Sequence, residues 1–169
     1  TGPDSYGQQK AAIEGLLKDA STRSGLEVVV ARAWSVSGGF VQKPHNYAFS
    51  DFVGSGIRDG LVRVTAPHLV RRRYCSVEDF LAVSFSGGRD QSFYELDSAG
   101  ELVELEELAN LVARELGGIP VEVKHFERRS SSPDDYFSDG IEWSSAVGEL
   151  NFVPTDLSTQ VRNVIQALS

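Results

Sequence analysis

SYGQQKAAIEGLLKDASTRSGLEVVVARAWSVSGG, residues 5–39, contains in succession the patterns of a helix, a strand and a loop. Apolar residues recur at helical spacing as far as Ala20, and Gly25 is a typical helix stop, so we predict a helix over residues 5–23. Leu26 to Ala31 is a run of mostly β-branched residues, which is typical of a strand buried on both faces of a parallel sheet. Residues 35–46 show no periodicity and predict a long loop, the kind of segment that often carries function.

The remainder of the chain continues the alternation of helices and strands. Further helices are predicted from apolar spacing at residues 49–57, 77–83, 105–116 and 157–168, the second of them capped by Ser76. Further strands are predicted at residues 61–66, 93–96 and 121–125, the first of them half-buried because its residues alternate. Residues 128–132 are a low-complexity patch and predict a loop. The order of elements predicts an α/β fold without internal repeats.

Composition limits the classes of function. The 169 residues are 41% hydrophobic and 24% charged, which is typical of a globular protein with a real core. The formal net charge of -8 argues against nucleic acid as a partner, because proteins that bind phosphate backbones carry a basic face. A single cysteine excludes an internal disulfide, and no secretory leader or long apolar run is present. We therefore predict a cytoplasmic protein with no membrane partner.

Metal binding and thiol chemistry are not indicated by the sequence. His45, His68 and His125 have no metal-ligand spacing with Cys75, so no metal site is predicted. Cys75 itself is predicted to be a small buried residue rather than a nucleophile.

Tyr6 and Lys10 form the first pair with a chemical use. They stand four residues apart, so on a helix they lie on one face, one turn from each other. A nearby ammonium favours the ionised form of a phenol, which suits a tyrosine for proton transfer near neutral pH. The pair alone is a weak signal, because this spacing occurs by chance on many helices.

Five segments in order strengthen that signal. The chain resembles the extended short-chain dehydrogenase/reductase family, in which Ser-Tyr-Gly-x-x-Lys opens a helix and an arginine-bearing strand leads into a substrate loop. The matching segments are Ser5-Tyr6-Gly7-Gln8-Gln9-Lys10, Val28-Val29-Val30-Ala31-Arg32 with Ala33-Trp34-Ser35-Val36-Ser37-Gly38, Arg72-Arg73-Tyr74-Cys75-Ser76-Val77-Glu78-Asp79, Phe93 to Leu116, and Arg129 to Asp139. Together they cover nearly the whole chain.

The resemblance implies a role for each matching residue. Tyr6 would be the catalytic acid and base, and Lys10 would hold the nicotinamide ribose of NAD, with NADP as the alternative cofactor. Arg72 and Arg129 match the family's arginines that contact the substrate diphosphate, where a planar fork of donors gives bidentate contacts. For Arg72 a solvated surface position is an equal alternative, because three adjacent arginines cannot all face one pocket.

The substrate loop contributes two further candidates. Ser35 stands where many relatives carry an asparagine that touches the sugar or its phosphate, a departure that puts the usual placement of a hexose in doubt. Asn46 lies later in the same loop and is a second candidate for contact with a nucleotide-sugar substrate. Loop polar groups of this kind more often only satisfy backbone groups.

The resemblance also implies an architecture. Residues 1–61 would be the end of a Rossmann-type parallel sheet, with the Tyr-x-x-x-Lys helix and the substrate loop. Residues 62–169 would mainly be a small mixed α/β substrate-binding domain. The helix over residues 5–23 would lie at the interface of a homodimer.

Two elements of the family have no counterpart in this sequence, namely the glycine-rich pyrophosphate turn and the Ser or Thr that assists the tyrosine. With a start at Thr1 and no Met, this predicts the carboxy-terminal part of an NAD-dependent epimerase or dehydratase, inactive in isolation. The alternatives are a non-catalytic module that binds nucleotide sugar or a partner protein, and a fragment with no activity.

Overall fold

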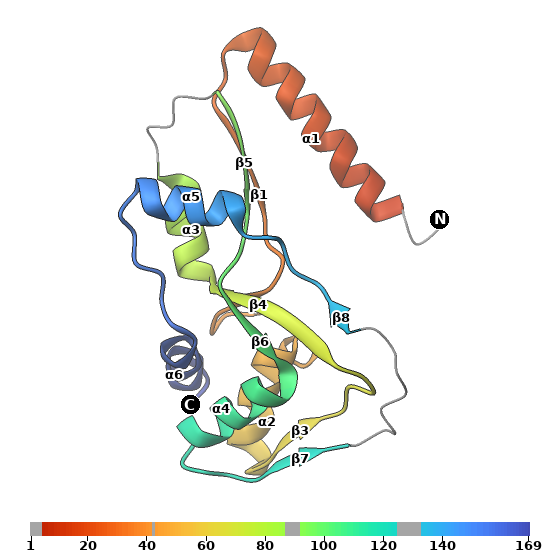
Figure 1. The fold of residues 1–169 in the computed structure, drawn as a ribbon, viewed down its shortest axis with the longest axis vertical. Helices are drawn as coiled ribbons and strands as arrows, with labels where there is room; N and C mark the ends of the chain where they lie inside the picture. Colours follow the sequence, from red (N-terminus) through yellow and green to blue (C-terminus); the bar gives the residue numbers. More distant parts are fainter. Residues whose placement is uncertain (1–4, 42, 87–91, 125–132) are drawn as a thin grey trace.

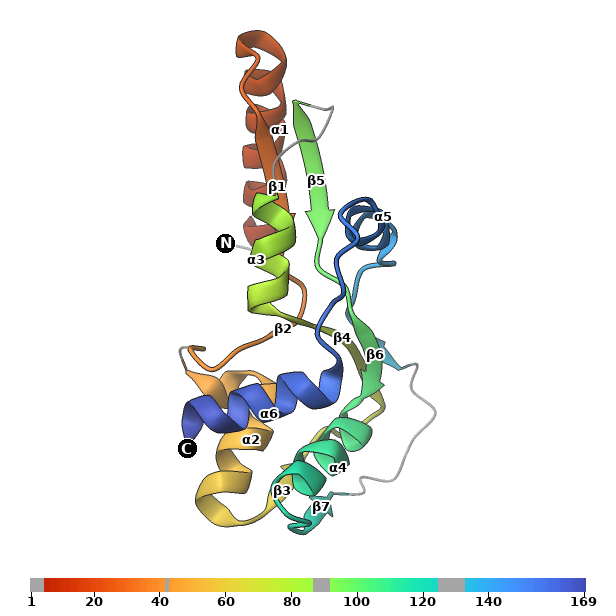
Figure 2. The ribbon, with the colours of Figure 1, turned by 90° about the vertical axis from the view of Figure 1, so that its left-hand side faces the viewer.

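The computed structural model describes residues 5–41, 43–86, 92–124 and 133–169. The molecule is elongated, with a helix and a parallel strand pair at one end and a helical bundle over short strands at the other (Figures 1 and 2). In chain order the elements are α1 (Ser5–Ser24), β1 (Val28–Arg32), β2 (Val36–Ser37), the 3-10 helix η1 (Pro44–Asn46), α2 (Ala48–Asp59), β3 (Val62–Val64), β4 (Val70–Ser76), α3 (Val77–Phe85), β5 (Phe93–Asp97), β6 (Glu101–Glu104), α4 (Leu105–Glu115), β7 (Val121–Val123), β8 (Asp134–Asp135), α5 (Ile141–Glu149) and α6 (Leu157–Leu168).

Three small sheets connect distant parts of the chain. β1 and β5 pair in parallel, and so do β3 and β7. The remaining sheet is centred on β4, which pairs in parallel with β2 and β8 and antiparallel with β6. Helices alternate with these strands, so the predicted α/β class is confirmed, with parallel pairs that include the predicted strand after α1.

Two hydrophobic cores hold the molecule together. The larger core joins α2, α4 and α6 to β3, β4 and β6, with Phe49, Leu108 and Val161 almost fully buried. The smaller core joins α3 and α5 to β5, through Phe80, Leu96 and other residues. β4 contributes to both cores, because Tyr74 lies in the first and Cys75 in the second.

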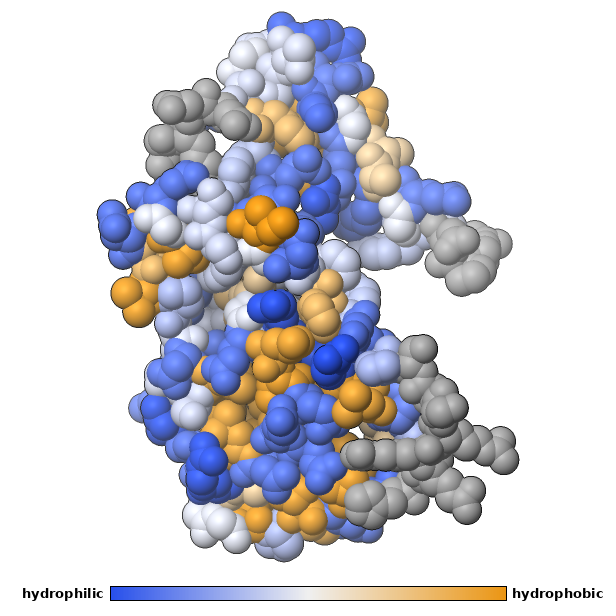
Figure 3. All heavy atoms as spheres, in the orientation of Figure 1, coloured by the Kyte–Doolittle hydropathy of each residue, from blue (hydrophilic) through white to orange (hydrophobic). Residues whose placement is uncertain are grey.

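The expectation that the first strand is buried on both faces was wrong. In β1 only Val30 is buried, and Val29 is 44% exposed. β1 has one strand neighbour, β5, among the described residues, and α1 buries only Ser21 of its own residues. Apolar side chains are accordingly visible along α1 at the upper right of Figure 3.

The predicted helices agree closely with α1, α2, α3, α4 and α6, and their end signals are seen. Ser76 accepts a hydrogen bond from the Asp79 N–H at the start of α3. Glu104 and Glu107 form a capping box at the start of α4, and Gly117 and Gly118 follow that helix with positive φ. β3 is half-buried, as its alternation predicts.

Other elements were not predicted. β4, β6 and α5 were not assigned, and the loop over residues 35–46 contains β2 and η1. Residues 128–132, predicted to form a loop, lie outside the described residues. The division at residues 61 and 62 stays a prediction. In the described part of the chain, no helix is long and apolar enough to cross a membrane.

Candidate functional site

A pocket of about 640 Å³ brings together three of the predicted substrate-binding residues. Ser35, Asn46 and Arg72 all line it, although they come from three different segments. Ser35 lies between β1 and β2, Asn46 ends η1, and Arg72 is in β4. The pairing of β2 with β4 sets this arrangement, since the Cys75 N–H donates to the Ser35 carbonyl at 3.3 Å.

Aromatic side chains form much of the remaining wall. Trp34, Tyr47, Tyr74 and Tyr136 line the pocket, and none of them was predicted as a site residue. The rings of Trp34 and Tyr136 lie 4.9 Å apart between centroids. Trp34 Nε1 is buried and has no hydrogen-bond acceptor among the described residues. Aromatic walls with one charged group are typical of pockets that hold a planar or sugar ring.

Among the described residues that line this pocket, Arg72 is the charged one, and it is already paired. Its Nη2 lies 2.9 Å from a carboxylate oxygen of Asp134, and its Nη1 donates to the backbone carbonyls of Arg71 and Asp134. The guanidinium also lies 5.7 Å from the Tyr136 ring centroid. The hydrogen bond from Arg72 lowers the pKa of the Asp134 carboxyl below its usual value.

Burial sets the protonation state of Tyr74, another residue of the pocket wall. It raises the pKa of Tyr74 to about 12, although the charge of Arg72 acts in the opposite direction. The Tyr74 phenol therefore stays neutral at physiological pH. It can orient a ligand by hydrogen bonding, but it does not supply a proton acceptor.

Strand alternation places Arg72 on the face of β4 opposite to Arg71 and Arg73. Arg71 pairs with Asp135 and does not line the pocket. Arg73 donates to the Gly100 carbonyl at 3.0 Å and lines a second pocket of about 580 Å³. None of the predicted site residues that the structure describes lines this second pocket.

Tyr6 and Lys10 share one side of α1, as predicted. Lys10 Nζ lies 5.4 Å from the centroid of the Tyr6 ring. Tyr6 is 69% exposed, and neither residue lines the pocket that holds Arg72. The structure thus brings the pair together without placing it in that pocket.

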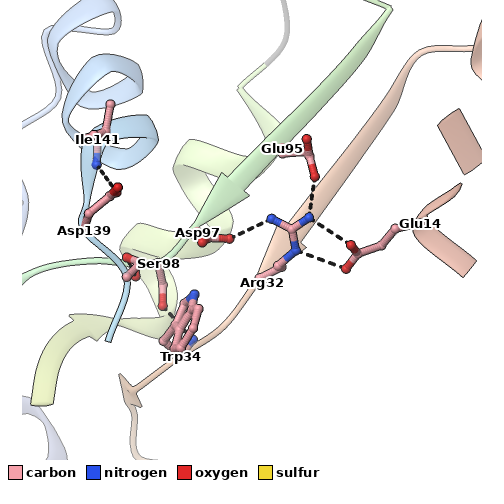
Figure 4. A network of polar contacts seen from close by, with 9 residues as sticks. Glu14, Arg32, Trp34, Glu95, Asp97, Ser98, Asp139 and Ile141 are labelled. Carbon is pink, nitrogen blue, oxygen red and sulfur yellow. Dashed lines mark hydrogen bonds and ion pairs between the residues drawn. The ribbon is translucent and has the colours of Figure 1, made fainter. Parts of the chain in front are cut away.

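A polar junction attaches this helix to the strand pair. Arg32 of β1 forms ion pairs with Glu14 of α1 at 2.8 Å, with Asp97 at 3.1 Å and with Glu95, both at β5 (Figure 4). These contacts, led by the hydrogen bond to Glu14, raise the pKa of Arg32. Glu14 continues the row of Tyr6 and Lys10 at four-residue spacing, so the junction fixes the face of α1 on which they lie.

One predicted site residue lies outside the described part of the chain. Arg129 lies among residues that the structure does not describe. No cluster of His, Cys, Asp or Glu in the described ranges can hold a metal ion. Cys75 is 2% exposed, and burial raises the pKa of its thiol to about 12, as suits the buried residue that was predicted.

Comparison with known proteins supports the resemblance. No family model matches the chain. The chain is 26% identical over 132 residues to UDP-glucuronic acid decarboxylase 3 of Arabidopsis thaliana, an alignment that covers 77% of this chain and 37% of the relative.

Solved structures show the same fold. A UDP-N-acetylglucosamine 4-epimerase from Bacillus cereus has a TM-score of 0.75 at 18% identity, with 96% of this chain and 55% of that chain covered. A UDP-glucose 4-epimerase from Brucella ovis, solved in complex with NAD, has a TM-score of 0.67 at 20% identity over 96% and 55%. An NAD-dependent NDP-hexosamine 5,6-dehydratase has a TM-score of 0.68 at 14% identity over 96% and 52%.

The resemblance predicted from the motifs is therefore confirmed. In sequence the chain is similar to a nucleotide-sugar decarboxylase, and in fold it is similar to NAD-dependent epimerases and dehydratases. The chain spans about half the length of these solved structures and 37% of the decarboxylase.

Proposed function

We propose that this chain forms the part of an NAD-dependent epimerase or dehydratase that holds a nucleotide sugar. The observation that carries the proposal is the pocket in which Ser35, Asn46 and Arg72 meet beside aromatic walls. Arg72 supplies a planar cation for the diphosphate. The rings of Trp34 and Tyr136 supply faces for a base or a sugar.

Tyr6 and Lys10 are the proposed catalytic residues. Tyr6 takes a proton from a hydroxyl of the sugar and returns it at the end of the reaction. Lys10 holds the ribose of NAD and keeps a positive charge close to the Tyr6 ring, from whose centroid it lies 5.4 Å. NAD, when bound, would supply hydride-transfer chemistry at a sugar carbon. NADP is the alternative cofactor, and the outcome of inversion, dehydration or reduction stays open.

The residues present fit part of a dinucleotide. Tyr6 and Lys10 face the same way on α1, where a ribose hydroxyl can meet both of them. A pyrophosphate needs backbone N–H groups at a glycine-rich helix start, and this sequence has no such turn after a strand. We therefore propose that the active enzyme combines these 169 residues with a dinucleotide-binding half.

Binding of UDP-sugars to the chain tests the pocket. We expect the Arg72→Ala variant to bind UDP-sugars at least about tenfold more weakly, the loss expected for one charge-assisted contact, measured by isothermal titration calorimetry. Arg71→Ala is the matched control, because Arg71 is the adjacent arginine and lies outside the pocket. Equal affinities of the two variants for UDP-sugars would show that Arg72 does not contact the ligand. Ser35→Ala and Asn46→Ala test the other two contacts.

The catalytic step needs a separate measurement. With the dinucleotide-binding half present, we expect Tyr6→Phe to lower kcat by about 10²–10⁴-fold, the usual contribution of a positioned acid or base. KM for the nucleotide sugar should change much less than kcat, because the pocket around Ser35, Asn46 and Arg72 supplies most of the contacts that bind the nucleotide sugar. An unchanged kcat would exclude Tyr6 as the proton carrier.

A second candidate function is a non-catalytic module that binds nucleotide sugar or a partner protein. It is favoured by a pocket in which Ser35, Asn46 and Arg72 meet, while Tyr6 is exposed outside it. This function predicts full binding of UDP-sugar by the chain alone, and no NAD-dependent turnover in any context. If the chain is instead a fragment with no activity, no ligand should raise its Tm.

We also propose a homodimer that uses α1. Ile13 and Leu16 are more than half exposed on this helix, and such apolar side chains favour a protein contact. Analytical ultracentrifugation of the wild type and of an Ile13→Glu variant tests the proposal, since only the wild type should dimerise. The cytoplasmic location stays a prediction.

A further inference from the structure

Asp134 holds an unusual position at the edge of the nucleotide-sugar pocket. It is in β8, which pairs in parallel with β4, so that Asp134 lies opposite Val70. A carboxylate oxygen of Asp134 lies 2.9 Å from Nη2 of Arg72. The backbone carbonyl of Asp134 accepts a hydrogen bond from Nη1 of the same arginine at 2.7 Å. His68 Nε2 lies 3.9 Å from the same carboxylate. The charged residue that lines this pocket is thus already compensated by an anion of the protein.

The geometry of the guanidinium makes this pairing a competition. Arginine offers two forks for a phosphate, the Nε and Nη2 pair or the Nη1 and Nη2 pair, and both use Nη2. In this chain Nη2 is the nitrogen that contacts the Asp134 carboxylate. A phosphate that approaches either fork therefore meets a like charge at the shared nitrogen.

We propose that Asp134 is a specificity-determining residue, which neutralises Arg72 until a ligand phosphate displaces its carboxylate. The proposal rests on the proposed function in one respect, because it takes Arg72 as the residue that meets the diphosphate. Ligands without a phosphate do not compete with Asp134, whereas a diphosphate with two or more negative charges does so effectively. Asp134 thus sets how much negative charge a ligand needs in order to bind to Arg72.

Displacement of the Asp134 carboxylate from Arg72 requires only a movement of the Asp134 side chain. The Asp134 backbone is held by its own N–H, which donates to the Leu69 carbonyl at 2.8 Å, and by the pairing of β8 with β4. The side chain is 45% exposed, so its carboxylate can turn into water. β8 can stay in place while Nη2 of Arg72 becomes free.

Asp135 provides a matched control on the same strand. It carries the same charge and also pairs with an arginine, Arg71. Arg71 does not line the pocket, so the loss of its ion pair with Asp135 leaves the pocket lining unchanged. An Asp135→Asn variant removes one negative charge from β8 without releasing Arg72.

The test measures binding of UDP and of inorganic pyrophosphate by calorimetry at fixed ionic strength. We expect Asp134→Asn to bind both about tenfold more tightly than the wild type, the factor that corresponds to one charge-assisted contact. Asp135→Asn should differ from the wild type by less than about threefold, because its effect is a screened charge at a distance. In an Arg72→Ala background, the effect of Asp134→Asn should fall to less than about threefold, the size of a screened charge alone.

The outcomes separate the two proposals. If the wild type binds UDP through Arg72 but Asp134→Asn gains nothing, the role of Asp134 is refuted and the proposed function stands. If pyrophosphate binds tightly to Asp134→Asn through Arg72 while UDP-sugars bind to no variant, the competition stands and the proposed function fails. If Asp134→Asn does not bind pyrophosphate at all, or gains as much as Asp135→Asn, the competition is refuted. Circular dichroism confirms that each variant is folded.

Discussion

Cys75 shows how one residue can sit beside a site without taking part in its chemistry. It follows the pocket residue Tyr74 on β4, yet its side chain points into the smaller core and is 2% exposed. Burial, with a smaller contribution from Asp79, raises the pKa of the thiol to about 12. The thiolate, which is the reactive form, is therefore scarce at neutral pH.

We predict that Cys75 does not react with Ellman's reagent in the folded protein at pH 8. In denaturant it should react at once, with a stoichiometry of one thiol per chain. The increase in absorbance at 412 nm with and without denaturant measures both states. Rapid labelling of the folded protein would mean that the smaller core opens readily around β4.

Glu14 carries a testable electrostatic contribution. Arg32 lowers the pKa of Glu14 below its ordinary value of 4.5 by donating a hydrogen bond. The carboxylate is thus favoured in the folded state, and its stabilising effect is complete above pH 4.5 and disappears as pH falls through the lower folded pKa. Glu14→Gln should lower the free energy of unfolding by about 0.5 kcal/mol at pH 7, since the pair is partly exposed.

The measurement is urea unfolding at pH 7 and at pH 3, with wild type and variant compared at each pH. The difference should be smaller at pH 3, because protonation removes the charge from the wild type as well. Glu122→Gln is a control, since Glu122 pairs with Arg63 on the surface, with both side chains about half exposed. A Glu14→Gln effect that is the same at both pH values would show that packing, and not charge, accounts for it.

The site could be predicted from the sequence only in part, and particular residues show why. Tyr6 and Lys10 are four residues apart on a helix, so their proximity follows from spacing alone. Trp34 and Tyr136 are about a hundred residues apart, and only the folded chain brings their rings to 4.9 Å. The contact between Arg72 and Asp134 likewise depends on β8 pairing with β4, which no local pattern indicates.

At the scale of elements, the junction between β5 and β6 depends on a glycine. Gly100 lies so close to β4 that an added Cβ would be 2.0 Å from the Tyr74 carbonyl oxygen and 2.7 Å from its carbonyl carbon. Backbone atoms cannot turn away as side chains do, so either β4 or the junction must shift. The antiparallel pairing of β4 with β6 starts at the adjacent residue, Glu101.

We predict that Gly100→Ala lowers the free energy of unfolding by about 3 kcal/mol or more, as overpacking against backbone does. Gly54→Ala is the control, because nothing lies within 4 Å of its added Cβ within α2. That change should stabilise the protein by up to about 1 kcal/mol through helix propensity. Thermal unfolding should show a lower Tm for the first variant and an equal or higher Tm for the second. A Gly100→Ala protein with wild-type Tm would contradict the close approach.

The elements differ in how well local pattern predicts them. α2, α4 and α6 each bury one apolar face in the larger core, and their spacing is visible in the sequence. β4 was missed because Arg71, Arg72 and Arg73 interrupt its apolar pattern, and it is recognised only through its partners β2, β6 and β8. α5 is short and follows Gly140, which has positive φ and no side chain with which to cap it.

At the scale of the whole molecule, the pocket lies between the two ends of the elongated fold. Residues 33–36 lead from β1 to β2 and line it, and β4 reaches it from the two cores. The backbone N–H of Trp34 donates to Ser98 Oγ at 2.9 Å, which attaches this crossing to the segment after β5 (Figure 4). Elements from both ends of the molecule thus support the pocket. α1, by contrast, is attached through the β1 and β5 strand pair at one end of the molecule.

That difference predicts uneven stability along the molecule. α1 is 20 residues long but buries only Ser21, and its contacts are with β1 and β5. Its attachment depends on the Arg32 junction and on Ser21 Oγ, which donates to the Ser92 carbonyl at 2.8 Å. Most of the stability of helices in proteins comes from packing of an apolar face, which α1 lacks, so little besides these contacts keeps it formed. α2 and α4, by contrast, each bury five or more residues.

We predict that amides of α1 exchange with deuterium at least about 100-fold faster than those of α2 and α4, as expected for an element that opens without global unfolding. Hydrogen exchange followed by mass spectrometry measures this at a protein concentration where ultracentrifugation shows monomers. Arg32→Ala should accelerate exchange in α1 further and leave α2 unchanged, because only α1 loses its junction. At higher concentration, slower exchange in α1 alone would show a partner chain on this helix. Protection of α1 equal to that of α2 in the monomer would contradict the view that the helix is held by a few polar contacts.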